Sequence, residues 1–170
     1  MITFRNVIIN DFSLMYRWLQ LPHVKKFWYA NDNFTYEETC EKYEHRLNDG
    51  VHHMYIIQYN NLDIGFLQSY LIENSLPFKV DEPIVGVDLY IGEIEYFHKN
   101  HGKDILKTFI KNYVFINKEI HYVGIDPEIN NRDAIKAYKK AGFHHVNTEY
   151  STEMKKMTYY MTLKRSKLYL

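Results

Sequence analysis

Residues 84–117, IVGVDLYIGEIEYFHKNHGKDILKTFIKNYVFIN, contain the pattern around which the rest of the chain is organised. An apolar strand over residues 84–91 leads through a polar loop, rich in Asn and His, into a long helix over residues 102–117. A helix that starts after such a loop leaves backbone N–H groups free at the positive end of its dipole, which suits a phosphate or pyrophosphate. Taken alone, the stretch is more typical of an ordinary strand–loop–helix connection.

A second stretch, IDPEINNRDAIKAYKKAGF at residues 125–143, makes the ligand-binding interpretation more specific. It is similar at nearly every fixed position to DPxxxNxRAIxAYxKxGF, the pattern that closes the acetyl-CoA site in the GNAT family of N-acetyltransferases. GVDLYIG at residues 86–92 resembles the central strand of one branch, the aminoglycoside 6'-N-acetyltransferases. MYRWLQLPHVKKFW at 15–28 and NNLDIGFLQSY at 60–70 resemble that branch too, so the resemblance extends over about residues 14–143.

The resemblance implies an α/β (α+β) architecture, the GNAT fold. Its central sheet is mixed, mostly antiparallel and twisted, with about six to seven strands flanked by about four helices. Strands 4 and 5 of that sheet are parallel and splayed, and acetyl-CoA binds there as a co-substrate. A length of 170 residues suits a single domain, so we expect one acetyltransferase domain over residues 1–170.

The loop at residues 97–102, FHKNHG, departs from the family's phosphate loop. That loop usually reads Arg or Gln, two residues, Gly, one residue, then Gly or Ala. Gly102 matches, whereas Phe97 replaces the leading residue and Asn100 replaces the first Gly. Asn tolerates the left-handed conformation best among other residues, so the turn can survive, and whether Asn100 weakens CoA binding stays open. The residues expected to hold CoA phosphates are His98, Lys99, Asn100, His101, Gly102 and Lys103.

Composition and charge restrict the class of protein further. Hydrophobic residues make up 46% and aromatic residues 16%, as in a globular chain. Lys plus Arg and Asp plus Glu number 21 each, and a net charge of zero argues against nucleic acid as the main partner. The single Cys40 excludes an intramolecular disulfide, and the nine histidines lack metal-site spacing, so no metal is expected. Without a signal or long apolar run, we expect a cytoplasmic monomer or homodimer with no membrane partner.

Local signals predict the order of the elements. We expect strands over residues 2–9, 53–59, 62–72, 84–91, 121–126, 144–150 and 157–163, and helices over residues 11–19, 35–48, 102–117 and 131–141. Thr35 and Glu38 form a capping box, Asn60-Asn61 predicts a tight hairpin turn, and Gly142 predicts a helix C-cap.

Three further expectations concern helix ends, a buried helix face and the chain end. Asn10 or Asp11 is expected to cap the first helix. The tail from residue 164 is expected to be poorly ordered or to form a dimer contact. The helix at 102–117 is expected to pack one stripe against the sheet, made of Ile105, Leu106, Phe109, Ile110, Tyr113 and Val114.

Acetyl transfer requires a polarised thioester carbonyl, a neutral amine and a protonated or stabilised thiolate. By the resemblance, backbone N–H groups of Leu89, Tyr90 and Ile91 polarise the thioester. Asn131 and the helix that it opens, including Ala134, hold the pantetheine. Tyr138 lies where the family places an acid near the CoA sulfur, and packing within the helix is its alternative role.

Asp88 is distinctive because it interrupts an apolar strand, and a buried carboxylate needs a partner. Matched to the aminoglycoside branch, Asp88 and Asp126 would bind ammonium or hydroxyl groups of the acceptor, and Asp88 is also the candidate base. Asp126 serves equally well as the turn residue before the next helix. Acidic residues gather on and around the loop at residues 73–83, which precedes the strand containing Asp88. Such a cluster would attract a polycation, and a solvated acidic face is the alternative interpretation. The other expected acceptor-binding residues are Trp28, Tyr29, Glu73, Asp81 and Glu82.

The function expected from these residues is acetyl-CoA-dependent transfer of an acetyl group to a primary amine of a polycationic small molecule. The first candidate is an aminoglycoside 6'-amine, acetylated directly in a ternary complex. A second possibility is a GNAT enzyme acting on another amine, such as a polyamine, a protein N-terminus or a siderophore hydroxylamine. A third is a CoA-binding protein without catalysis, suggested by Asn100 in the phosphate loop.

Overall fold

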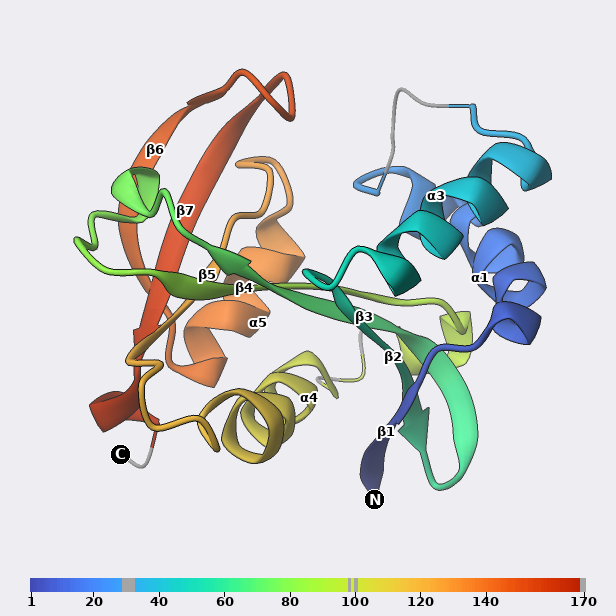
Figure 1. Cartoon of the computed structure of the whole chain (residues 1–170), viewed down its shortest axis with the longest axis horizontal. Helices are drawn as coiled ribbons and strands as arrows, with labels where there is room; N and C mark the ends of the chain where they lie inside the picture. Colours follow the sequence, from blue (N-terminus) through green and yellow to red (C-terminus); the bar gives the residue numbers. More distant parts are fainter. Residues whose placement is uncertain (29–32, 98, 100, 169–170) are drawn as a thin grey trace. The chain divides into compact units, whose positions relative to one another are not determined.

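The computed structural model describes residues 1–28, 33–97, 99 and 101–168, and its strands form a mixed sheet (Figure 1). Among these residues, seven strands lie in the order β1-β2-β3-β4-β5-β7-β6. The strands are β1 (Ile2–Asn6), β2 (His53–Tyr59), β3 (Leu62–Ile72), β4 (Ile84–Ile91), β5 (Tyr122–Ile125), β6 (His144–Ser151) and β7 (Lys156–Lys164). β4 and β5 run parallel, whereas β1–β2, β2–β3, β5–β7 and β6–β7 are antiparallel. The predicted mixed, mostly antiparallel fold with parallel strands 4 and 5 is confirmed.

The α-helices of the described chain are α1 (Phe12–Leu19), α2 (Pro22–Lys25), α3 (Tyr36–Asn48), α4 (His101–Phe109) and α5 (Arg132–Ala141). Five further helical turns are η1 (Ile9–Asp11), η2 (Leu76–Phe78), η3 (Ile94–Tyr96), η4 (Ile110–Val114) and η5 (Arg165–Lys167). Of these, η4 is a π-helix that continues α4, and the others are 3₁₀ turns. Within the described ranges, no helix combines the length and the apolar character that crossing a membrane requires.

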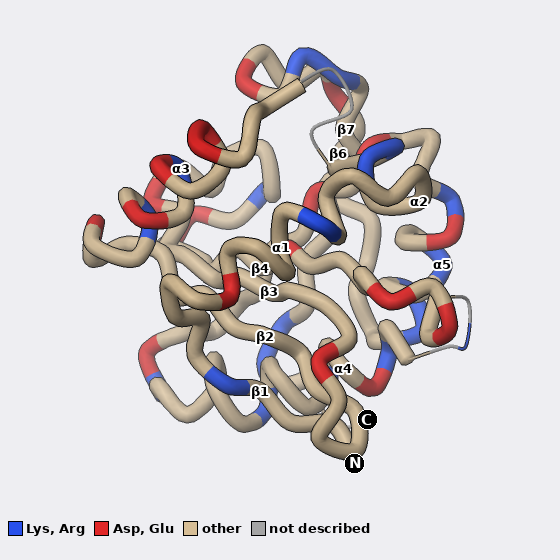
Figure 2. The backbone as a smooth tube through the Cα atoms, turned by 90° about the vertical axis from the view of Figure 1, so that its right-hand side faces the viewer, with Lys and Arg blue, Asp and Glu red and all other residues tan. Residues whose placement is uncertain are grey.

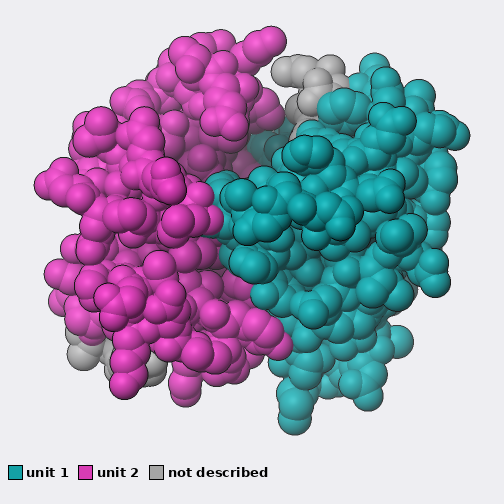
Figure 3. All heavy atoms as spheres, in the orientation of Figure 1, with its two compact units in different colours: residues 1–70, 88–99 teal, residues 71–87, 100–170 magenta. Residues whose placement is uncertain are grey.

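The chain divides into two compact units, coloured separately in Figure 3. Unit 1 comprises Met1–Tyr70 and Asp88–Lys99, and unit 2 comprises Leu71–Val87 and Asn100–Leu170. β4 belongs to both units, because its first half lies in unit 2 and its second half, from Asp88, lies in unit 1.

In unit 1, α1 and α3 pack together and their apolar faces meet the strands (Figure 1). α1 buries Phe12, Met15, Trp18 and Leu19 along one face. Gly92 follows β4 where the Trp18 ring approaches so closely that a Cβ at this position would lie 2.2 Å from the ring. Only glycine fits there, so the second Gly of GVDLYIG serves core packing in this unit.

Two local signals in unit 1 are confirmed, the capping box of α3 and the turn between β2 and β3. Thr35 Oγ1 accepts a hydrogen bond from Glu38 N at 3.2 Å, and Glu38 Oε2 accepts one from Thr35 N at 2.8 Å, so the capping box is confirmed. The hairpin turn has Asn60 and Asn61 at φ 49° and 66°, the left-handed values that a type I' turn requires. α3 and the β2–β3 hairpin therefore form as the sequence predicts.

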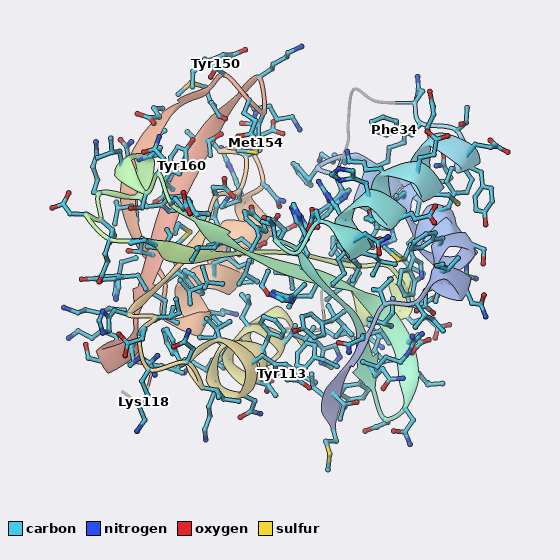
Figure 4. The ribbon with its side chains drawn as sticks, viewed as in Figure 1. Phe34, Tyr113, Lys118, Tyr150, Met154 and Tyr160 are labelled. Atoms are coloured by element: carbon cyan, nitrogen blue, oxygen red, sulfur yellow. The ribbon has the colours of Figure 1, made fainter. Side chains whose placement is uncertain are left out.

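In unit 2, α4 and α5 lie side by side (Figure 1). β6 and β7 form a long antiparallel hairpin, and Tyr150 and Met154 lie toward its turn (Figure 4). Asn131 caps α5, accepting a hydrogen bond from Ala134 N at 3.3 Å, and Gly142 ends that helix at φ 105°. The C-cap predicted at Gly142 is confirmed, and Asn131, expected to open the helix, supplies its N-cap.

Four expectations about element ends are corrected. β1 stops at Asn6, short of residue 9, because the chain turns into η1. Asp11 precedes α1, but its carboxylate accepts from Ile8 N and pairs with Arg5 instead of capping the helix. The helix predicted to residue 117 ends as a π-helix, which leaves Tyr113 43% exposed and stacked on Phe109 (Figure 4). β7, predicted over residues 157–163, is longer and extends to Lys164.

The chain end was expected to be poorly ordered, and the described part of it is anchored instead. Arg165 donates to the carbonyl oxygens of Ile120 at 2.9 Å and Phe115 at 2.6 Å, and also to that of Asn117. Its guanidinium lies 4.5 Å from the Phe115 ring centroid. Because Arg165 satisfies carbonyl groups that follow the π-helix, it fixes the segment after β7 within unit 2.

Candidate functional site

Asp88 is the fifth residue of β4 and is held by a chain of side chains within unit 1. Gln68 of β3 donates from Nε2 to Asp88 Oδ2 at 2.8 Å. Arg46 of α3 in turn donates from Nη1 to Gln68 Oε1 at 2.9 Å. The carboxylate that interrupts the apolar strand therefore has the partner that its position requires.

Burial raises the pKa of Asp88 above its ordinary value, because desolvation disfavours the charged carboxylate. The residue is partly exposed, yet its carboxyl end lies among protein groups. Hydrogen bonds from Gln68 and Tyr70 and the charges of Arg46 and His52 oppose this rise in pKa without cancelling it. A carboxylate whose pKa is moved toward neutral pH is suited to accept a proton.

His52 is oriented by the turn that precedes β2. Its Nδ1 lies 2.6 Å from Asp49 Oδ2, and Asp49 Oδ1 accepts hydrogen bonds from the N–H groups of His52 and Val51. The His52 N–H is the main cause that holds the pKa of Asp49 well below its usual range. The His52 ring also lies against that of Tyr70, with centroids 5.3 Å apart. The surroundings of Asp88 are thus fixed from α3, from β3 and from this turn.

An aromatic wall occupies the same unit. Trp28 packs edge-on against Tyr90, with ring centroids 4.9 Å apart, and against Phe66 at 5.9 Å. Trp28 also lines a small, open hollow together with Leu19, Gln20, Lys25, Asn33, Phe34 and Thr39. Trp28 was predicted to line an acceptor wall, and it serves the core as well as this hollow. Tyr29 lies outside the described residues.

The three residues predicted to polarise the thioester form the end of β4 in unit 1. The Tyr90 side chain belongs to the apolar core, while Leu89 and Ile91 are partly exposed. The Ile91 carbonyl oxygen lies 3.1 Å from His23 Nε2, so α2 touches the end of the strand here. His23 was not singled out from the sequence.

Residues predicted to hold CoA phosphates occur in both units. His98 and Asn100 lie outside the described residues, and Lys99 is exposed in unit 1. In unit 2, α4 begins at His101, followed by Gly102 and the exposed Lys103. A Cβ on Gly102 would lie 3.4 Å from Ala137 Cβ, so α4 starts close against α5. A helix start of this kind fits a phosphate group, since its first N–H groups lack helical partners.

Asn131, Ala134 and Tyr138 are positioned by α5 in unit 2. The cap bond engages Asn131 Oδ1 and the Ala134 N–H, so the Asn131 amide N–H₂ is the part suited to a further ligand. Tyr138 is 9% exposed, and its ring lies 6.3 Å from that of Phe143. Both proposed roles of Tyr138, helix packing and proton donation, are compatible with this position.

The acidic residues predicted from unit 2 have different surroundings. Glu73 and Asp81 are exposed on the segment between β3 and β4, whereas Glu82 lies 3.0 Å from His121 Nδ1. Asp126 is half-buried at the end of β5. Burial raises the pKa of Tyr160 in β7, and the negative charges of Asp126 and Glu149 raise it further.

Sequence reasoning missed Arg46, Gln68, Tyr70 and His52. Gln68 carried a recognisable signal, because it is a polar residue inside an apolar strand, as Asp88 is. Arg46 carried none, since an Arg near the end of an amphipathic helix ordinarily faces solvent. An exposed acidic row on α3 was missed as well; it is formed by Glu37, Glu38, Glu41 and Glu44 (Figure 2).

The chain is similar to known proteins in sequence and in fold. Residues 8–149 match the profile of a family described as "Acetyltransferase (GNAT) domain". The aminoglycoside N(6')-acetyltransferase type 1 of Klebsiella pneumoniae is 26% identical over 153 residues, covering 86% of this chain and 76% of that protein. An N-hydroxyputrescine acetyltransferase of Acinetobacter baumannii is 34% identical over 67 residues, covering 39% of this chain and 31% of that protein.

A solved structure extends the likeness to the whole fold. It is aminoglycoside acetyltransferase AAC(6')-Ib in complex with coenzyme A and kanamycin, which matches with a TM-score of 0.86. The match covers 99% of this chain and 98% of that one at 24% identity. At this identity the likeness shows the fold alone.

Proposed function

Because this chain belongs to the GNAT family of acetyltransferases, we propose that it transfers the acetyl group of acetyl-CoA to a primary amine of a polycationic small molecule, with an aminoglycoside 6'-amine as the first candidate. The observation that carries this proposal is Asp88, a carboxylate inside β4 whose pKa is raised by burial. The 26% identity to an aminoglycoside 6'-acetyltransferase over 153 residues supports the choice of acceptor. We further propose that the whole chain acts as one catalytic domain.

The chemistry begins with the acceptor ammonium, which must lose a proton before it can attack. Asp88 takes that proton, directly or through a water molecule. The amine nitrogen then forms a bond to the thioester carbonyl carbon, while N–H groups at the end of β4 stabilise the developing oxyanion. As the carbon–sulfur bond breaks, Tyr138 donates a proton to the departing thiolate. The second proton of the nitrogen passes through solvent to the Tyr138 oxygen, and Asp88 releases the first proton to solvent. The products are the acetamide and CoA, formed in one ternary complex.

Charge supports a polycationic acceptor. The exposed carboxylates of α3 lie in the same unit as Asp88. A concentration of negative charge raises the local concentration of cations, and its effect weakens as salt is added. A neutral or anionic acceptor would gain nothing from such a surface.

The test is release of CoA thiol from acetyl-CoA by the purified protein, with kanamycin, tobramycin, spermidine and short peptides as acceptors. We expect turnover with an aminoglycoside, and a loss of about 100-fold or more in kcat for Asp88→Ala, as for removal of a general base. Tyr138→Phe is expected to lower kcat with little effect on acetyl-CoA binding, which calorimetric titration measures in parallel. Turnover of no aminoglycoside, despite measurable acetyl-CoA binding, would contradict the aminoglycoside assignment.

A second acceptor class is favoured by one specific observation, the 34% identity over 67 residues to an N-hydroxyputrescine acetyltransferase. That acceptor would be a hydroxylamine. The same assay with an N-hydroxylated diamine separates the two possibilities. A kcat/KM at least tenfold higher for the hydroxylamine than for kanamycin would assign the enzyme to it.

A further inference from the structure

Arg46 determines which end of the Gln68 amide faces Asp88. A guanidinium only donates hydrogen bonds, so the Gln68 atom that receives the bond from Arg46 Nη1 at 2.9 Å must be the carbonyl oxygen Oε1. The amide nitrogen then faces Asp88 Oδ2, 2.8 Å away. The opposite amide orientation would bring two donors together at Arg46 and two acceptors together at Asp88. The network therefore has one favourable orientation.

We propose that Arg46 is a positioning residue for acetyl transfer, acting through the Gln68 amide to hold the Asp88 carboxylate in place and to set its affinity for a proton. The inference rests on the proposed function, in which Asp88 is the base. It goes beyond that function because Arg46 lies on α3 and reaches Asp88 through an intermediate side chain.

The groups that face Asp88 within unit 1 come from three elements. α3 contributes Arg46, β3 contributes Gln68 and Tyr70, and the turn before β2 contributes His52, which is paired with Asp49. A cation and two hydrogen-bond donors all favour the ionised carboxylate. Removing Arg46 takes away the charge and also frees the amide to rotate, so Asp88 loses a defined partner.

The experiment compares the dependence of kcat/KM on pH for the wild type, Arg46→Met and Arg46→Lys. Lys42→Met is the matched control, because it removes the same charge from the same helix and its Nζ lies over Phe34, 4.7 Å from the ring centroid. We expect the acid limb to move to higher pH by about one unit or more in Arg46→Met, as when a nearby opposite charge is lost. Arg46→Lys is expected to move it less, and Lys42→Met to leave it unchanged.

Gln68→Leu, alone and combined with Arg46→Met, tests whether Arg46 acts through the amide. If it does, the shift in the double variant is smaller than the sum of the two single shifts. Equal shifts from Arg46→Met with and without Gln68 would overturn the proposed route, and an unmoved acid limb would overturn the role of Arg46 altogether. Thermal melting and calorimetric titration with acetyl-CoA verify that each variant is folded.

A second readout separates this inference from the proposed function. The Asp88 carboxyl is titrated by ¹³C NMR, with Asp88→Asn used to assign its signal. If no amine is acetylated but the Asp88 titration moves to higher pH in Arg46→Met, the coupling of Arg46 to Asp88 stands and the proposed function fails. An Asp88 titration that is the same in wild type and Arg46→Met overturns the coupling, whether or not turnover is observed.

Discussion

Asp88 combines two properties that oppose each other, a buried position and a charge. Its pKa is raised mainly by desolvation, while Gln68, Tyr70, Arg46 and His52 stabilise the ionised form. A fully compensated carboxylate would remain ionised and would be a weak base. An uncompensated one would destabilise the fold. The partial compensation leaves a carboxyl group whose pKa is raised, and so a stronger base than an ordinary aspartate, which is the property that acetyl transfer to an ammonium requires.

This balance predicts that Asp88→Asn stabilises the protein while it abolishes turnover. A carboxyl group whose folded pKa lies above its unfolded value of about 3.9 favours folding when protonated, and this contribution is lost as pH rises through the folded pKa. The neutral amide keeps the size of the side chain and escapes this loss. We expect Tm at pH 8 to rise by about 2–4 °C, equivalent to roughly 1 kcal/mol.

The same variant supplies its own control, because the gain in Tm must shrink as pH falls through the folded pKa of Asp88 and vanish below pH of about 4. Melting curves of wild type and variant from pH 4 to pH 8 measure it. An unchanged or lower Tm at pH 8 would mean that the partners of Asp88 stabilise the charge more than burial opposes it.

At the scale of single elements, α3 begins at a local capping box and also carries Arg46, which contacts another element. Its start is determined by Thr35 and Glu38, whose reciprocal hydrogen bonds satisfy N–H groups that the first turn leaves free. Its C-terminal half presents Arg46 toward Gln68, and its exposed row is acidic. Because α3 carries Arg46, the stability of this helix affects the surroundings of Asp88. Weakening its N-terminal cap is therefore expected to disturb Asp88 indirectly.

We predict that Thr35→Ala lowers the free energy of unfolding by about 1 kcal/mol, because it removes an N-cap acceptor. Urea denaturation followed by circular dichroism measures the change. Thr35→Ser is the matched control, since Ser supplies the same hydroxyl acceptor and should remain within about 0.5 kcal/mol of the wild type. A loss as large in Thr35→Ser would show that the methyl group, and not the cap, stabilises this helix.

At the scale of the whole molecule, the chain passes between the two compact units at three points. One of these points lies within β4, whose residues Ile84–Val87 belong to unit 2 and Asp88–Ile91 to unit 1. A strand forms as a continuous ladder, so neither unit contains the whole of β4 by itself. This connectivity favours one folding unit.

We therefore predict that the protein unfolds in a single cooperative transition. Differential scanning calorimetry should give a calorimetric enthalpy equal to the van't Hoff enthalpy, the standard test for two-state unfolding. Tryptophan fluorescence reports on unit 1, where Trp18 and Trp28 lie, and its melting midpoint should coincide with that from circular dichroism. Two separated transitions would indicate that the units unfold independently.

The sequence by itself determined the features that depend on near neighbours along the chain. The capping box, the Asn60-Asn61 turn, the C-cap of α5 and the bounds of β2, β3 and β4 all follow from residues within a few positions of each other. The motif at residues 125–143 was enough to identify the family. Two errors had different causes. Arg5 and Ile8, both near Asp11 in the sequence, engaged the carboxylate that was expected to cap α1, whereas the chain end was anchored by long-range hydrogen bonds of Arg165.

Only the tertiary structure decided what surrounds Asp88. Arg46, Gln68 and Asp88 are separated by 22 and 20 residues in sequence and come from a helix and two strands. Helical and strand periodicity report which face of an element is apolar, but they do not report which polar groups of different elements meet. The proton affinity of a carboxylate depends on the charges and donors within a few ångströms of it, and folding alone brings these together.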